Sequence, residues 1–67
     1  MDLGQRIRQV REKRNISQRQ AAMSADICPA SWNRLEGKDS NPTYSTLKRV
    51  AETLGVPIAM LFFVEVD

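Results

Sequence analysis

Histidine is missing from this 67-residue chain, and cysteine occurs once, at Cys28. A single thiol cannot form an internal disulfide, and without histidine the chain has no plausible set of zinc ligands. It has no run of about 18 apolar residues that would predict a membrane span. Its charged N-terminal stretch does not resemble a signal peptide. We therefore expect no metal, no membrane contact and, with a free thiol, a location in the cytoplasm.

The chain also has few residues suited to a catalytic site. Three glycines are present, none in a phosphate-binding loop, and no histidine or metal-ligand cluster is available to build a catalytic site. We expect no enzyme activity and no cofactor. A chain of this size forms one domain, residues 1–67, and buries only about 60% of its unfolded surface. Well-packed helices or oligomerisation must therefore supply the stability.

The net charge is only +2, but the charges are unevenly placed along the chain. The stretch 5–19 holds one acid, Glu12, against a run of basic residues: Arg6, Arg8, Arg11, Lys13, Arg14 and Arg19. After Thr53 the only charges are Glu65 and Asp67. The basic run is either a solvated helix face or a surface that attracts phosphate, and charge alone does not decide between them.

Caps and apolar periodicity predict five helices. Leu3, Ile7 and Val10 recur at helical spacing, so a first helix covers about residues 2–14, with Asp2 as its N-cap and Asn15 suited to its end.

A capping box formed by Ser17 and Gln20 begins a second helix, which runs to about residue 25. Asp26 suits the turn that follows. A third helix, residues 29–36, begins with a proline at its first position.

Thr43 caps a fourth helix that ends at Gly55 and has a continuous apolar face: Leu47, Val50, Ala51 and Leu54. Pro57 opens a last short helix that reaches Phe62 or the residue after it. Residues 64–67 alternate like a short C-terminal β-strand. The expected fold is therefore all-α, with this strand as a candidate addition.

Residues 17–36 form the most informative unit. Two short helices joined by a tight turn are typical of a helix-turn-helix, which lays its second helix in the major groove of DNA. Its apolar contacts come from Ala21, Ala25, Ile27, Trp32 and Leu35. Trp32 is expected in the core, with the two alanines making room for its bulk. Ala22 is small where the helices should approach most closely.

From about Leu3 to Phe62 the chain resembles the lambda-repressor-like (Cro/repressor, XRE-type) helix-turn-helix domains. The matching pieces, in register, are Ile7-Arg-x-x-Arg11, Ile16-Ser-Gln18, Ala22, Ile27, Arg34-Leu-Glu36, Asn41-Pro42-Thr43, Leu47, Ala51-x-x-Leu-Gly-Val56 and Leu61-Phe62. The resemblance implies a compact five-helix domain that binds double-stranded DNA. It also implies an ion pair between Arg11 and Glu36, for which the alternative is two independent surface charges. The chain departs from the family pattern at several positions. Asp26 replaces the usual glycine of the turn, Cys28 replaces the usual Ser or Thr cap, Pro29 and Ala30 replace residues that often form hydrogen bonds, and Ala59 and Met60 replace residues that are commonly acidic or polar.

In this docking mode the outward residues of the third helix face the bases, and they are Pro29, Ala30, Ser31, Asn33 and Arg34. Arg34 suits guanine, Asn33 suits adenine unless it is merely solvated, and Ala30 suits a thymine methyl group. The expected phosphate contacts are Gln18, Arg19, Arg11 and Lys38. A redox role for Cys28 stays open as an alternative.

The segment 57–67 is more apolar than a monomer exposes comfortably. We expect Leu61 and Phe62 to enter the core. The remaining apolar residues predict a homodimer interface, formed by Ile58, Met60, Phe63, Val64 and Val66. The alternative is that the segment only completes the core of a monomer.

The sequence thus predicts a small sequence-specific transcriptional regulator that binds a palindromic operator as a dimer. A phage-type repressor, a restriction-modification controller and an antitoxin all fit this description. A protein-interaction module of the same fold, with weak or no specific DNA binding, is the alternative.

Overall fold

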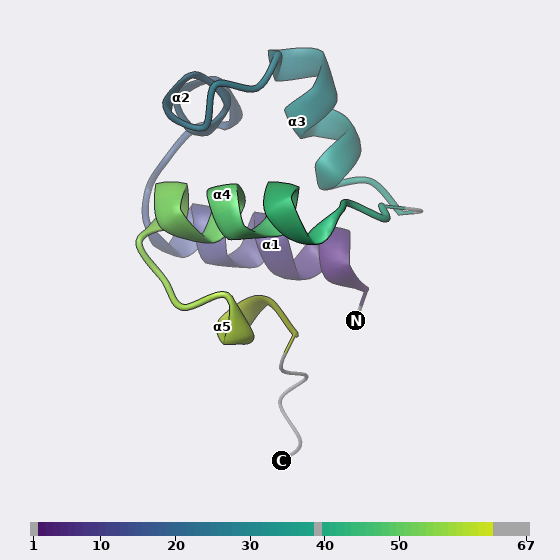
Figure 1. Ribbon diagram of the computed structural model, residues 1–67. Coiled ribbons are helices and arrows are strands. Elements are labelled where there is room, and N and C mark those ends of the chain that lie inside the picture. The colour runs from purple at the N-terminus through teal and green to yellow at the C-terminus, as the bar shows by residue number, and fades with distance from the viewer. Residues whose placement is uncertain (1, 39, 63–67) are drawn as a thin grey trace.

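Five α-helices account for most of residues 2–38 and 40–62, the part of the chain that the computed structural model describes (Figure 1). They are α1 (Leu3–Lys13), α2 (Gln18–Ser24), α3 (Pro29–Leu35), α4 (Tyr44–Leu54) and α5 (Ala59–Phe62). In Figure 1, α2 and α3 lie at one end of the molecule, α1 and α4 occupy the middle, and α5 lies at the other end. The all-α prediction is confirmed, while the candidate strand at 64–67 lies outside the described residues.

The helix starts follow the cap signals in the sequence. Asp2, Ser17 and Thr43 precede α1, α2 and α4, and each side chain accepts a hydrogen bond of 2.8–3.2 Å from the backbone N–H three residues on. Gln20 completes the capping box by accepting from the Ser17 backbone N–H at 3.0 Å. Because these caps satisfy N–H groups that the helices themselves cannot, the starts are determined locally.

Within residues 2–38 and 40–62, three residues take the left-handed conformation that ends a helix or turns the chain. Gly55 has φ of +70° at the end of α4, and Asn15 and Asp26 have φ of +58° and +57°. Asn and Asp are among the few residues other than glycine that tolerate this region. The structure therefore confirms that Asp26 turns the chain where a glycine is usual.

One apolar core joins the helices. Its largest fully buried side chains are Trp32, Ile7, Leu54 and Val50. Three alanines of α2 and the turn are buried in the same cluster, Ala21, Ala22 and Ala25. The core position predicted for Trp32 is thus confirmed.

The prediction for the last helix is half wrong. Leu61 is buried, but Phe62 is 55% exposed. Consecutive residues on a helix point about 100° apart, so a single turn that directs Leu61 into the core turns Phe62 away from it. The helix also begins at Ala59, two residues after Pro57.

Helix α1 contacts α5 at one end of the molecule and the chain segment after α3 at the other. Arg6 donates from Nε to the carbonyl oxygen of Met60 at 2.9 Å, which ties α5 to α1. At the start of α1, the buried Gly4 lies directly against the backbone that follows α3. A Cβ at position 4 would lie 2.9 Å from the carbonyl carbon of Glu36 and would collide with the carbonyl oxygen of Gly37. This close approach fixes where α3 ends relative to α1.

Candidate nucleic-acid interface

The unit formed by α2, the turn and α3 occupies one end of the molecule (Figure 1). In the turn, the Ile27 backbone N–H donates to the Ala22 carbonyl at 2.8 Å. Pro29 takes the first position of α3, where its missing N–H has no helical partner to lose. The N-cap Cys28 is exposed and makes no side-chain capping bond.

The third helix has one buried side and one open side. Trp32 is fully buried and Leu35 packs partly buried against the same core. All five residues predicted to face bases are exposed: Pro29, Ala30, Ser31, Asn33 and Arg34. The structure therefore leaves all the predicted reading residues exposed on a helix whose Trp32 and Leu35 pack against the core.

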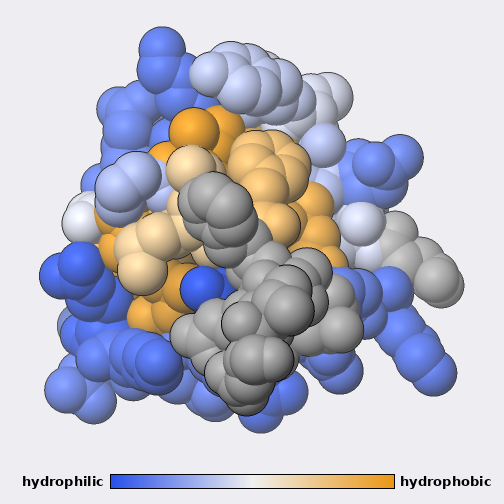
Figure 2. All heavy atoms as spheres, turned by 90° about the horizontal axis from the view of Figure 1, so that it is seen from below, coloured by the Kyte–Doolittle hydropathy of each residue, from blue (hydrophilic) through white to orange (hydrophobic). Residues whose placement is uncertain are grey.

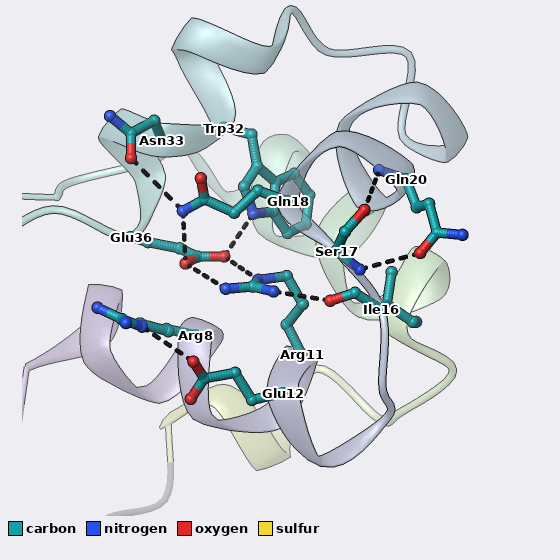
Figure 3. A network of polar contacts seen from close by, with 10 residues as sticks. All are labelled: Arg8, Arg11, Glu12, Ile16, Ser17, Gln18, Gln20, Trp32, Asn33 and Glu36. Atoms are coloured by element: carbon teal, nitrogen blue, oxygen red, sulfur yellow. Dashed lines mark hydrogen bonds and ion pairs between the residues drawn. The ribbon is translucent and has the colours of Figure 1, made fainter.

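That anchor is centred on Glu36 (Figure 3). Arg11 reaches both of its carboxylate oxygens, with Nε 2.6 Å from Oε2 and Nη2 3.2 Å from Oε1. The indole Nε1 of Trp32 donates to Oε2 at 2.5 Å, and Gln18 Nε2 donates to Oε1 at 3.0 Å. A third guanidinium nitrogen of Arg11 donates to the Ile16 carbonyl at 2.7 Å. Helices α1, α2 and α3 are thus bonded to one carboxylate, which we call the Glu36 network.

The side chains of Arg11 and Glu36 are only 10% and 3% exposed, so this ion pair is shielded from water. Burial alone raises the pKa of Glu36. Hydrogen bonds from Arg11, Gln18 and Trp32, together with the charge of Arg11, outweigh burial and hold the pKa of this carboxyl below its ordinary value. The group therefore stays ionised at neutral pH and accepts hydrogen bonds only.

The structure sorts the four expected phosphate contacts into different environments. Arg19 and Lys38 are exposed, whereas Gln18 is half-buried and its amide nitrogen is engaged within the Glu36 network. Arg11 does not fit the phosphate role, because its guanidinium is buried and bonded to Glu36 and Ile16. We therefore remove Arg11 from the expected phosphate contacts.

The basic run of the first helix is also largely occupied within the chain. Arg6 and Arg14 donate to the backbone carbonyls of Met60 and Gly55, and Arg8 pairs with Glu12 at 3.2 Å on the surface. These bonds favour a structural reading for much of this run. The exposed cations on or beside the helix-turn-helix are Arg19, Arg34 and Lys38.

The predicted dimer segment is only partly described. Ile58 is half-buried and Met60 is 42% exposed, while Phe63, Val64 and Val66 lie outside the described residues. Figure 2, seen from the end that carries α5, shows apolar side chains reaching the surface there. The exposed Phe62, unexpected from the sequence, adds to this apolar surface.

Two structural features were not expected from the sequence: the close approach at Gly4 and the hydrogen bond from Trp32 to Glu36. Gly4 carried no turn signal, so nothing in the sequence indicated the close approach to Gly37. The bond from Trp32 to Glu36 could have been found, because a buried indole N–H needs an acceptor and the two residues are four apart on one helix face.

Comparison with known proteins agrees with this geometry. The chain belongs to the helix-turn-helix domain family, whose profile matches residues 4–64. It is 34% identical over 61 residues to the immunity repressor protein of Bacillus phage phi105. That match covers 91% of this chain but 42% of the phage protein, so the chain spans less than half of its relative.

No solved protein structure matches the chain significantly. Within the described ranges 2–38 and 40–62, none of the helices combines the length and the apolar character needed to cross a bilayer.

Proposed function

We propose that this chain is a sequence-specific double-stranded DNA-binding domain that regulates transcription, with α3 lying in the major groove. The observation that carries the proposal is the two-sided arrangement of α3. Its inner side is fixed by the buried Trp32 and by the Glu36 network, while its outer residues are exposed together at one end of the molecule. A helix held in this way can enter a groove without losing its packing.

Arg34 is the strongest candidate for base readout. It is exposed in the last turn of α3, and its guanidinium suits guanine O6 and N7. Asn33 precedes it and offers an amide to base edges. Ala30 offers only a methyl group, and Pro29 has no hydrogen-bonding side chain, so few residues carry sequence information. Part of the specificity then rests on DNA shape.

The proposed phosphate contacts lie on either side of this helix. Arg19 and Lys38 contribute exposed cations. Gln18 contributes through its backbone N–H at the first position of α2, since its side-chain nitrogen is used within the chain. These contacts set the register on DNA and carry the salt dependence of binding.

The phage relative, a repressor by name, favours repression as the direction of regulation. The proposed DNA-binding role favours the cytoplasm as the location. A repressor role is also compatible with the small size of the domain, because occupying an operator needs no catalytic site.

An electrophoretic shift with random duplex DNA at two salt concentrations tests DNA binding directly. We expect binding that weakens as salt rises, and a sequence motif after selection from a random DNA library. The start of α3, with Cys28, Pro29 and Ala30, offers few hydrogen-bonding side chains. This shortage favours the second candidate, a protein-interaction module. Absence of salt-dependent binding would support that module and refute our proposal.

We further propose that the domain is a homodimer through the apolar end around α5. Ile58, Met60 and Phe62 supply partly or largely exposed apolar surface there, and a two-fold dimer matches a palindromic operator. The residues Phe63, Val64 and Val66 belong to the proposed interface as well.

Light scattering at high micromolar concentration tests the dimer. We expect dimer mass for the natural chain and monomer mass after Met60→Lys with Phe62→Lys. Tyr44→Lys is the matched control, because Tyr44 is also an exposed large side chain but lies at the start of α4. A monomer in the natural chain, or a control that dissociates equally, contradicts the interface.

A further inference from the structure

Glu36 holds the side-chain amide of Gln18 in one orientation. Glu36 Oε1 lies 3.0 Å from Gln18 Nε2, and the paired Arg11 keeps the carboxylate charged. An ionised carboxylate has no proton to donate, so the group that faces it must be the NH2 of Gln18 and not its oxygen. Reversing the amide would place two acceptors against each other. The negative charge of Glu36 therefore determines which way the Gln18 amide faces.

Gln18 in turn orients Asn33. The Gln18 nitrogen carries two hydrogens, and besides the bond to Glu36 it donates to Asn33 Oδ1 at 3.4 Å. Figure 3 shows the Asn33 oxygen directed at Gln18 and its nitrogen on the opposite side, away from the network. Asn33 is exposed on the open side of α3. What it presents outward is therefore a hydrogen-bond donor.

Resting on the proposed function, we propose that Asn33 contacts DNA as a donor whose polarity is set by Gln18 and Glu36, so that it favours guanine over adenine. Adenine is read by an asparagine that turns both its oxygen and its nitrogen toward the base. Here the oxygen is directed inward, which disfavours that pairing. Guanine offers two acceptors, O6 and N7, to the outward NH2 group. The structure thus reverses the adenine preference expected from the residue type.

Selection of bound sequences from a random duplex library tests the assignment, using the full chain and three variants. Asn33→Ala identifies the base position that Asn33 reads, because only that position loses its preference. In the natural chain we expect guanine over adenine there by about fivefold or more. Gln18→Met keeps the length of the side chain but removes both bonds, so adenine should gain at that position alone. Gln5→Met is the matched control, since Gln5 is exposed on α1 and remote from Asn33 in the sequence.

Asn33→Asp provides a second test that replaces no residue of the Glu36 network. Its carboxylate accepts from Gln18 on one side and presents an acceptor to DNA on the other. The preference at the same position should then move to cytosine, whose N4 amino group donates. This result does not depend on how well Gln18→Met folds.

The outcomes separate this inference from the proposed function. Adenine at the Asn33 position, a Gln18→Met motif with the natural base preference, or no altered position in Asn33→Ala overturns the inference. In each of these cases an enriched motif still supports DNA binding. A natural chain that enriches no motif at all refutes the proposed function, and the inference with it.

Discussion

Gly4 and Gly37 touch through their backbones, which brings the first turn of α1 against the chain segment leaving α3. A Cβ at position 4 would meet the Gly37 carbonyl oxygen and approach the Glu36 carbonyl carbon to 2.9 Å. Both obstacles are backbone atoms, which cannot rotate aside as a flexible side chain can. The contact places the end of α3 beside α1, and with it the Glu36 network.

Gly4→Ala should destabilise the domain by about 1–3 kcal/mol, because the added methyl forces the two segments apart. The direction of this change in stability is informative, because alanine is otherwise a better helix former than glycine by about 1 kcal/mol. Chemical denaturation followed by the fluorescence of the single Trp32 measures the change. Gln5→Ala, one residue further on and exposed, should change stability little. A Gly4→Ala variant as stable as the natural chain would show that the close approach is absent.

Glu36→Gln should be strongly destabilising, by about 3–5 kcal/mol, because it leaves Arg11 buried without a charged partner. The matched control is Glu12→Gln, which removes the exposed ion pair with Arg8. The side chains of that pair are 62% and 56% exposed, so its loss should cost less than about 1 kcal/mol. Thermal or urea unfolding of both variants gives the comparison. Equal effects in the two variants would contradict a structural role for the buried pair.

Acid should weaken the fold through the same carboxyl. The pKa of Glu36 is below its ordinary value in the folded state, so the unfolded chain binds more protons between the two pKa values. The stabilisation is complete above the ordinary pKa of about 4.3 and is lost as the pH falls through the folded pKa. The free energy of unfolding, measured from about pH 7 down to about pH 3, should show this decline.

The two glutamate variants also serve as controls for the pH series. Glu36→Gln should lack this part of the pH dependence, because its side chain does not titrate, whereas Glu12→Gln should retain it. A decline of the same size in Glu36→Gln would assign the acid sensitivity to other carboxyl groups.

Arg34→Ala and Lys38→Ala should weaken DNA binding in different ways. Loss of Arg34 removes the proposed base contact and should relax discrimination at one position by about 1–3 kcal/mol. Loss of Lys38 should lower affinity for all sequences and reduce the slope of log K against log salt by about 0.9. Binding titrations at several salt concentrations, on a selected site and on random duplex, distinguish the two. If both variants lose affinity uniformly, Arg34 is a phosphate contact and not a reader.

The sequence was sufficient for the features that depend on near neighbours in the chain. The capping box of Ser17 and Gln20, the caps Asp2 and Thr43, and the left-handed turn at Asp26 all involve residues within a few positions of one another. Trp32 was also placed correctly, because its size and helical spacing leave few sites other than the core.

Features that depend on distant parts of the chain were predicted less well. Phe62 was expected in the core because it is apolar, but which side of a one-turn helix faces inward depends on α1, far away in sequence. Gln18 was expected to bind phosphate with its side chain and backbone N–H together, yet its side-chain nitrogen bonds to Glu36, 18 residues later. Arg11 was assigned two roles by resemblance, and burial leaves room for only one. Such outcomes follow from tertiary contacts, on which residue type and spacing carry little information.

The residues that hold α3 in place are separate from the residues at its start. Its anchors, Trp32, Leu35 and Glu36, all lie in the second half of the helix or just beyond it, whereas residues 29–31 are exposed at its start. Residues 29–31 can therefore be replaced as a cassette while the scaffold is left intact. A library randomised at these three positions should keep the fold, because none of them contributes a buried side chain. Sequencing the DNA that its members select would show how far residues 29–31 set the proposed target.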